Sequence, residues 1–276
     1  MTAEVPQAAE GSGCDPGHTP NPGGRQVFNV ADAGISGIQA PRDLLIEESD
    51  LRGKTGVFPD RRQAGRLLAN RLRDISDRKG IILAIPAGGI PVACAVAEEL
   101  GLDLDVIVVR KLQIPGNQEA GFGAVGPSGE ILLHERIVED LKLSAKEINV
   151  QVDETLQVLK HREFLFRKGK PAPDLKDRQV ILVDDGLATG YTMLAAASYV
   201  RQQEARQVIV ASPTASQRTV NFLLPQVDVL VCLNIRGGPV FAVADAYQNW
   251  RDVEEEEAAR LLFETQEKSF RAAPPE

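Results

Sequence analysis

The amino-acid sequence predicts an α/β fold in which a parallel β-sheet is flanked by helices. Two features of its 276 residues carry this prediction. The first is a series of short, unbroken apolar runs such as Val180–Val183, whose length and turn-forming flanks are typical of strands buried on both faces. The second is the alternation of these runs with segments of helical apolar spacing, which is typical of a parallel sheet covered by helices.

The alternation begins at Pro59, after a less regular start. Apolar residues at helical spacing predict the first helix, and arginines occupy its other face. Pro91 suits the first turn of the second helix, which continues to Gly101. The predicted elements of this half are a helix over 60–76, the strand Ile81–Ile85, a helix over 91–101, the strand Val106–Val109, a glycine-rich stretch over 112–130 and the short strand Ile131–Leu133.

The second half continues the same alternation. Ser144 followed by Glu147 resembles a capping box and predicts the start of a long helix. Acidic residues at 254–257 suit the N-terminus of the final helix. The predicted elements are the long helix from Ser144, the strand Val180–Val183, a helix over 191–203, the strand Val208–Ala211, a helix over 218–224, the strand Val229–Leu233 and an acidic helix over 253–270.

The domain boundaries follow from composition. Residues 1–24 contain nine Gly and Pro residues and no apolar periodicity, so we expect a disordered tail. Residues 25–58 carry apolar residues interrupted by glycine and proline, which we interpret as an extension that leans on the main domain. Residues 59–235 carry the regular alternation and form the predicted core, and residues 236–276 follow it and include the C-terminal helix.

The composition argues against several classes of protein. Thirty-one Lys and Arg against 39 Asp and Glu give a net charge of −8, which disfavours a nucleic-acid partner. Three widely spaced cysteines indicate a reducing compartment, and with only three histidines a dedicated zinc site is not expected. No apolar run is long enough to cross a bilayer, and the opening residues lack the basic region of a secretory leader. We therefore expect a cytoplasmic protein without a membrane partner.

Two motifs match nucleotide-binding signatures in sequence, but their sequence context does not suit nucleotide binding. Gly121–Gly126 fits the dinucleotide pattern G-x-G-x-x-G, but Pro127-Ser128-Gly129 follows immediately, so no helix can begin there. A glycine-rich hairpin explains the spacing better. Gly53-Lys54-Thr55 ends like a phosphate-binding loop, but Glu48 stands where its first glycine should be. We interpret that segment as a surface turn.

The most informative segment is Val180–Thr192, in which a buried strand leads through two carboxylates and a small-residue turn into a helix. Backbone N–H groups of 188–192 would point into the turn, where a helix N-terminus favours an anion such as a monophosphate. Asp184 and Asp185 suit a ribose diol, or a magnesium ion bound to it. The alternative is that one carboxylate caps the helix and the other forms a buried salt bridge.

This pattern resembles the signature of type I phosphoribosyltransferases, which bind 5-phosphoribosyl-1-pyrophosphate (PRPP). Three further segments look like bacterial and archaeal members of unassigned substrate, and the resemblance covers about residues 59–265. It implies a parallel sheet flanked by helices, a small hood over the acceptor, and Mg²⁺ as cofactor. The supporting segments are Asp60-Arg61-Arg62-Gln63-Ala64-Gly65, Pro86–Ala93, and Val108–Leu112 followed by Pro115-Gly116-Asn117.

The resemblance also implies residue roles. Ala87, Gly88 and Gly89 would form the pyrophosphate loop, and Arg110 and Lys111, at the end of the second strand, would supply positive charge as catalytic residues together with the Asp pair. Residues 112–128 would form a mobile loop that closes over the reacting centre. The remaining implied PRPP-binding positions follow the buried strand: Asp184, Asp185, Gly186, Ala188, Thr189, Gly190, Tyr191 and Thr192.

Two positions depart from the family pattern. Relatives usually carry Arg at the position of Ala87, so one donor to the pyrophosphate is lost, and Tyr191 replaces a small residue. The hood candidate is Arg236–Trp250, in which Phe241 or Tyr247 would stack on a planar base. Ordinary packing within a capping segment explains the same two aromatic rings.

These features support three hypotheses about function. The leading hypothesis is Mg²⁺-dependent transfer of the phosphoribosyl group from PRPP to a small nitrogenous acceptor, such as a nucleobase. In this hypothesis the protein has no direct metal site beyond Asp184 or Asp185. The second is a regulatory protein that binds PRPP without turning it over, which Ala87 favours. A dehydrogenase based on Gly121–Gly126 ranks last. A homodimer is compatible with the resemblance.

Overall fold

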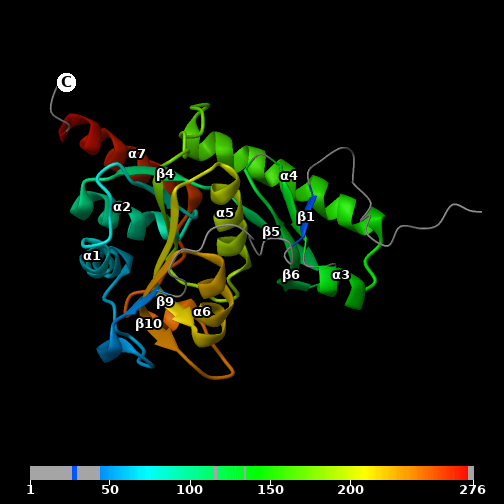
Figure 1. Ribbon diagram of the computed structural model, residues 1–276, viewed down its shortest axis with the longest axis horizontal. Helices are drawn as coiled ribbons and strands as arrows, with labels where there is room; N and C mark the ends of the chain where they lie inside the picture. Colours follow the sequence, from blue (N-terminus) through cyan, green and yellow to red (C-terminus); the bar gives the residue numbers. More distant parts are fainter. Residues whose placement is uncertain (1–26, 30–43, 115–116, 128, 134, 273–276) are drawn as a thin grey trace, which may run out of the picture.

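The computed structural model describes residues 27–29, 44–114, 117–127, 129–133 and 135–272. The tail predicted over 1–24 lies outside the described residues. Two sheets organise the chain, one of six strands and one of four (Figure 1). Of the residues that the structure describes, none belongs to a helix that is both long and apolar enough to cross a membrane.

The larger sheet confirms the predicted parallel architecture. Every strand pairs parallel to its neighbours, and the apolar runs of β3, β8 and β10 are buried along their whole length. In sheet order the strands are β2 (Leu44–Glu47), β10 (Val229–Arg236), β9 (Gln207–Ser216), β8 (Gln179–Val183), β3 (Ile81–Ala84) and β4 (Asp103–Val106).

Helices cover both faces of this sheet (Figure 1). The two hydrophobic clusters divide each strand by alternation: Ile82 and Ala84 pack with α1, α2 and α7, whereas Ile81 and Leu83 pack with α5 and α6. The helices are α1 (Arg61–Leu72), α2 (Gly89–Leu100), α5 (Tyr191–Gln202), α6 (Gln217–Leu223) and α7 (Glu255–Ala272), with short 3-10 turns at Ser49–Leu51, Leu224–Gln226 and Val243–Ala246.

The second sheet was not expected from the sequence. Its order is β1 (Val27–Asn29), β7 (Ile131–Leu133), β6 (Asn117–Val125) and β5 (Arg110–Ile114), with β6 antiparallel to both β5 and β7. The short helix α3 (Glu135–Asp140) follows it. The long helix α4 (Ala145–Arg167) then begins at the predicted capping box, because Ser144 Oγ accepts from Glu147 N–H and the Glu147 carboxylate accepts from Ser144 N–H.

One prediction in this region is wrong. The strand predicted over Val106–Val109 spans Asp103–Val106 instead, because apolar content alone does not mark where pairing ends and 107–109 are buried while crossing between sheets. The described residues of the segment predicted to be a mobile loop, 112–128, lie largely on the antiparallel strands β5 and β6, and its closure over the reacting centre stays a prediction. Glycine is needed there for close packing: a Cβ on Gly123 would lie 2.3 Å from Leu132 O.

The rejected nucleotide motifs lie where the sequence suggested. Gly121–Val125 belongs to strand β6, so no helix begins at those glycines. Gly53, with φ of +72°, lies in an exposed turn after the first 3-10 helix. The extension is more integrated than expected, since β2 pairs in parallel with β10 as the edge of the larger sheet.

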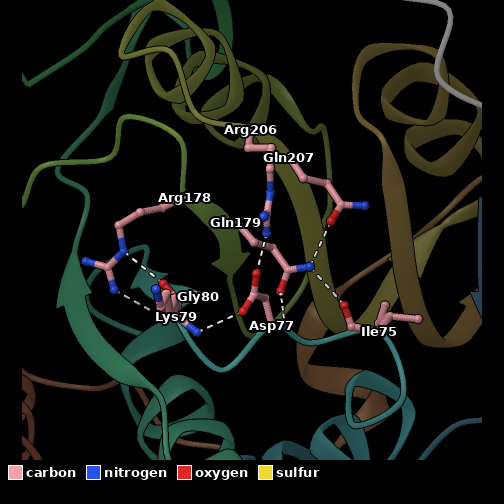
Figure 2. A network of polar contacts seen from close by, with 8 residues as sticks. All are labelled: Ile75, Asp77, Lys79, Gly80, Arg178, Gln179, Arg206 and Gln207. Carbon is pink, nitrogen blue, oxygen red and sulfur yellow. Dashed lines mark hydrogen bonds and ion pairs between the residues drawn. The ribbon is translucent and has the colours of Figure 1, made fainter.

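At the amino-terminal edge of the larger sheet, polar side chains tie the loop after α1 to the strands (Figure 2). Gln179 is 3% exposed; its amide donates to Ile75 O and Gln207 Oε1, and its Oε1 accepts from Asp77 N–H. Arg178 donates to Lys79 O and Gly80 O. The candidate site lies at the opposite edge of the sheet, where the parallel strands end.

Candidate active site

Two loops meet at the carboxyl edge of the larger sheet because β3 and β8 are neighbours, with Ala84 in register with Val183. The glycine loop after β3 lies against the carboxylates after β8. A Cβ on Gly88 would lie 2.2 Å from Asp185 Oδ2, and one on Gly89 would lie 2.8 Å from Val183 O. Only glycine permits this approach, so the structure brings together the glycine loop and the acidic pair that the sequence singled out.

The glycine loop also begins a helix. Ala87 and Gly88 are half-buried, and Gly88 is the N-cap of α2. The peptide bond between Pro86 and Ala87 is cis. The Gly89 N–H donates to Ile85 O at 3.1 Å and the Ile90 N–H donates to Ala87 O at 3.2 Å. This leaves the N–H groups of Ala87 and Gly88 as the candidate donors beside the carboxylates.

Asp185 forms an ion pair that sequence reasoning had not assigned. Arg61 Nε donates to Asp185 Oδ2 at 2.8 Å, and the two side chains are only 9% and 13% exposed. Arg61 occupies the first position of α1, where Asp60 caps the helix by accepting from Gln63 N–H at 2.8 Å. The salt-bridge part of the alternative interpretation therefore applies to Asp185.

Asp184, unlike Asp185, accepts its hydrogen bond from a backbone N–H group. Its Oδ1 accepts from Asp185 N–H at 2.8 Å. Burial raises the pKa of Asp184 well above the ordinary carboxyl value, and the negative charge of Asp185 raises it further. Neither carboxylate caps α5, whose N-cap is Gly190, so the capping part of the alternative does not apply.

The turn between the acidic pair and α5 leaves its own donors uncapped. Gly190 has a φ of +83°, which glycine adopts without strain, and it carries no side chain that could cap the helix. Ala188 and Thr189 are exposed, and Thr192 is half-buried. The N–H groups at the start of α5 therefore have no side-chain cap from Gly190, and an anion at this turn stays a prediction.

Neighbouring elements hold this turn in place. Ala188 O accepts from Thr219 Oγ1 and from Ser216 Oγ, both from the β9–α6 junction. The Tyr191 ring packs edge-on against Phe222 of α6, with centroids 5.3 Å apart. Tyr191 is therefore accommodated on the α6 side despite its departure from the family pattern.

The hood segment closes onto the acidic pair. A Cβ on Gly186 would lie 2.2 Å from Val243 Cγ1, and the Tyr247 hydroxyl donates to Asp185 O at 2.6 Å. Tyr247 is 6% exposed, and its ring centroid lies 5.6 Å from that of Phe58 and 5.3 Å from that of Trp250. Burial raises the pKa of Tyr247 well above its ordinary value. These contacts favour the packing interpretation for Tyr247.

Phe241 lies further along the hood, after β10. It is half-buried, and the Arg236 guanidinium lies 4.5 Å from its ring centroid. Arg236 in turn donates to Ala242 O and to Asp245 Oδ2. Phe241 is therefore the more accessible of the two predicted stacking residues.

Arg110 and Lys111 begin β5 of the second sheet, rather than ending a strand of the larger sheet as predicted. The sequence could not show this, because the parallel strand ends earlier than its apolar run. Burial lowers the pKa of Arg110, the positive charge of Arg162 lowers it further, and Glu255 opposes both effects. Arg162 itself pairs with Glu255, at the start of α7.

Known proteins are similar to this chain. The profile of the phosphoribosyl transferase domain matches residues 61–243. Two Mycobacterium tuberculosis proteins named as candidate phosphoribosyl transferases, Rv0571c of strain H37Rv and MT0597 of strain CDC 1551, are 36% identical over 206 residues, or 75% of this chain and 46% of each relative. The chain thus matches these curated relatives over about half of their length.

A solved structure agrees with these matches. The crystal structure of TT1426 from Thermus thermophilus is 37% identical and superposes with a TM-score of 0.66, covering 75% of this chain and 98% of TT1426. The domain match, the relatives and the shared parallel α/β fold all point the same way. The chain belongs to the type I phosphoribosyltransferase family.

Proposed function

We propose that this protein is a Mg²⁺-dependent phosphoribosyltransferase that transfers the 5-phosphoribosyl group of PRPP to a nitrogenous acceptor, with a nucleobase as the first candidate, and releases pyrophosphate. The observation that carries the proposal is the close approach of Gly88 and Gly89 to Asp185 and Asp184. One ligand spanning both loops would place a pyrophosphate at backbone donors and a sugar diol at carboxylates, which are the two chemistries that PRPP combines.

Each part of PRPP has a proposed partner. The pyrophosphate would meet Ala87, Gly88 and Gly89, and the ribose hydroxyls would donate to Asp184 and Asp185. The 5-phosphate would accept from the uncapped turn at the start of α5. The residues proposed for that turn are Gly186, Ala188, Thr189, Gly190, Tyr191 and Thr192.

The proposed reaction replaces one bond at the anomeric carbon. A nitrogen of the acceptor forms the new bond to that carbon and loses its proton, while the bond to the pyrophosphate oxygen breaks and the electron pair leaves with pyrophosphate. Negative charge therefore grows on the leaving group, so positioned donors and positive charge accelerate the step. Arg110 and Lys111, together with the Gly88 N–H, are the proposed source of that stabilisation, and the Gly89 N–H would contribute only if it left Ile85 O.

The acidic pair fits a role in holding Mg²⁺. Carboxylate oxygens are the ligands that Mg²⁺ prefers, and it commonly combines one or two of them with oxygens of a bound phosphate. Asp184 or Asp185 would hold the ion together with PRPP. When bound, Mg²⁺ supplies positive charge to the leaving pyrophosphate.

The acceptor would bind under the hood, near the site of reaction. Phe241 is the residue we propose for stacking on a planar base, because Tyr247 is enclosed by Phe58 and Trp250. The domain division is part of the proposal as well: residues 59–235 as the core, now joined by β2, and residues 236–276 as the hood and C-terminal helix.

A second function, PRPP binding without turnover, is favoured by one observation. Ala87 offers a backbone group but no side-chain donor at the position where relatives usually carry Arg. Losing one charged donor to the leaving group weakens catalysis more than it weakens binding of the ribose and its phosphate. A sensor would bind PRPP and release no pyrophosphate.

A pyrophosphate-release assay tests the proposal. The protein is incubated with PRPP, Mg²⁺ and a panel of nucleobases and other nitrogenous acceptors, beside the double variant Asp184→Asn, Asp185→Asn. We expect release that depends on one acceptor class and disappears in the double variant. Release that is equal in the variant would contradict the proposed site. PRPP binding with no release for any acceptor would support the sensor instead.

A further inference from the structure

We propose that Arg61 is a positioning residue that acts through Asp185, and that the hood locks Arg61 in place by stacking Trp250 on it. The inference rests on the proposed function, because it assigns how one of the ribose-binding carboxylates is aimed. Arg61 does not need to touch PRPP for this role. Its task is to fix the carboxylate that does.

Two hydrogen bonds and two aromatic rings hold the Arg61 guanidinium, and its Cζ lies 5.7 Å from the centroid of the Tyr247 ring. Its Nε donates to Asp185 Oδ2 at 2.8 Å, and its Nη1 donates to Arg251 O at 2.8 Å. Its plane lies over the Trp250 ring, with 3.9 Å between Cζ and the ring centroid. Two directed hydrogen bonds and a stacked face leave a planar group little freedom to rotate, so the carboxylate that it binds is restrained as well.

Asp185 is held at both its side chain and its backbone. Arg61 Nε donates to the Asp185 Oδ2 atom, and the Tyr247 hydroxyl donates to the backbone oxygen of Asp185. Gly88 lies against the same carboxylate on another side. Arg61 thereby fixes the position and orientation of the Asp185 carboxylate. The ion pair therefore determines the direction in which that carboxylate meets a sugar hydroxyl.

The contacts of Arg61 join two parts of the chain that are distant in sequence. Arg61 begins α1, whereas Tyr247, Trp250 and Arg251 belong to the segment that precedes α7. A change in the hood at Trp250 is thereby transmitted to Asp185 without any direct contact between them. Trp250 also packs against Tyr247, whose hydroxyl donates to Asp185 O, so the hood reaches Asp185 through Tyr247 as well.

The chemistry favours arginine over lysine at this position. Nε and Nη1 serve two separate acceptors while the flat face stacks on the indole, and an ammonium group cannot do all three. Lysine at position 61 would keep the positive charge beside Asp185 but lose the directed pair of bonds. Charge and direction can therefore be separated by experiment.

The test is isothermal titration of PRPP, in the presence of Mg²⁺, into the full chain and its variants. Arg61→Ala should weaken binding by about 10- to 100-fold, the range for losing a hydrogen bond to a charged group. Arg61→Lys should recover part of that loss. The matched control is Arg62→Ala, which removes the next arginine of α1 and its surface ion pair with Glu98.

A double-mutant cycle separates positioning from general stabilisation. If Arg61 acts through Asp185, then Arg61→Ala in an Asp185→Asn background should add less than about 2-fold to the loss caused by Asp185→Asn alone. Full losses in both backgrounds would overturn the inference. Unfolding in urea, measured on each variant, identifies any protein that is not folded at the titration temperature.

Trp250 provides a second test, in which both residues of the ion pair stay in place. Trp250→Ala should weaken PRPP binding by about 3- to 10-fold through loss of the stacked face, whereas Trp250→Phe should retain most of it. Equal binding by wild type, Arg61→Ala and Trp250→Ala would refute the positioning role. If the wild-type protein itself does not bind PRPP, the proposed function has failed, and the inference fails with it.

Discussion

Replacing Gly88 with alanine would test how tightly the glycine loop and the acidic pair are packed. The added Cβ would lie 2.2 Å from Asp185 Oδ2 and 2.7 Å from its Cγ. Both distances are far below van der Waals contact, so either the loop or the carboxylate must move. Gly88 has φ of −60° and ψ of −33°, which alanine adopts easily, so the whole cost is steric.

The magnitude follows from the crowding. Forcing one extra methyl group into a packed site costs about 1–3 kcal/mol of unfolding free energy. Displacing the Asp185 carboxylate also disturbs its 2.8 Å bond to Arg61, and losing a hydrogen bond between charged groups costs about 1.5–3 kcal/mol. If that second cost falls on ligand binding, we expect PRPP affinity to fall by at least about 10-fold.

The assay is calorimetric titration with PRPP and Mg²⁺, paired with urea unfolding. The control is Gly101→Ala at the end of α2, where an added Cβ meets nothing within 4 Å but φ is +67°. That backbone strain costs about 1–2 kcal/mol, so both variants should lose comparable stability. Only Gly88→Ala should lose affinity. Unchanged PRPP affinity in Gly88→Ala would refute the packing argument.

Three further predictions concern stability and reactivity. Gln179→Leu should lower the unfolding free energy by about 1–3 kcal/mol in a urea titration, because it removes the hydrogen bonds of a buried amide to half-buried partners. Burial raises the pKa of Cys94 to about 11 and that of Cys232 to about 12, so at about pH 8 both thiols should resist an aromatic disulfide reagent until the protein unfolds. Ser144→Ala should lower Tm. Hydrogen bonds from Ser144 lower the pKa of Glu147, so the capping box stabilises the protein above the ordinary carboxyl pKa and this contribution fades as pH falls through the lowered value.

Each of these predictions has a control and a contrary result. Gln157→Ala changes an exposed glutamine of α4, and a loss there equal to that of Gln179→Leu would contradict the network argument. The thiol experiment uses a Cys14→Ser background, and a native thiol that reacts at the rate of the unfolded protein would contradict burial. A difference in Tm between wild type and Ser144→Ala that grows in acid would contradict the sign derived for Glu147.

The parallel sheet could be predicted because its strands satisfy a strong local rule. A strand buried on both faces is apolar throughout, so β3 and β8 stand out against their turn-forming flanks. The candidate site could be predicted in outline for a related reason. Glycines and carboxylates that follow neighbouring parallel strands must meet at one edge, whatever the loops between them do.

The second sheet was missed because its sequence breaks that rule. The glycines of β6, which the sequence suggested as a flexible hairpin, permit close packing against β5 and β7. Strand β2 was missed because it is short and pairs with β10, which is distant in sequence. Such pairings leave no periodicity in a local window.

Arg61 was missed because its role depends on partners far along the chain. It lies 124 positions from Asp185, and local sequence shows only a basic residue at a helix start. The enclosure of Tyr247 by Phe58 and Trp250 is equally non-local. The same local sequence around a charged or aromatic residue is compatible with several roles, and only the tertiary contacts show which role the residue has.

The most direct test of the central claim is a crystal structure of this protein with PRPP and Mg²⁺. We predict the ribose hydroxyls at Asp184 and Asp185, the 5-phosphate at the turn before α5, and the pyrophosphate at Gly88 and Gly89. PRPP bound elsewhere on the molecule, or bound with its sugar away from the two carboxylates, would contradict the account.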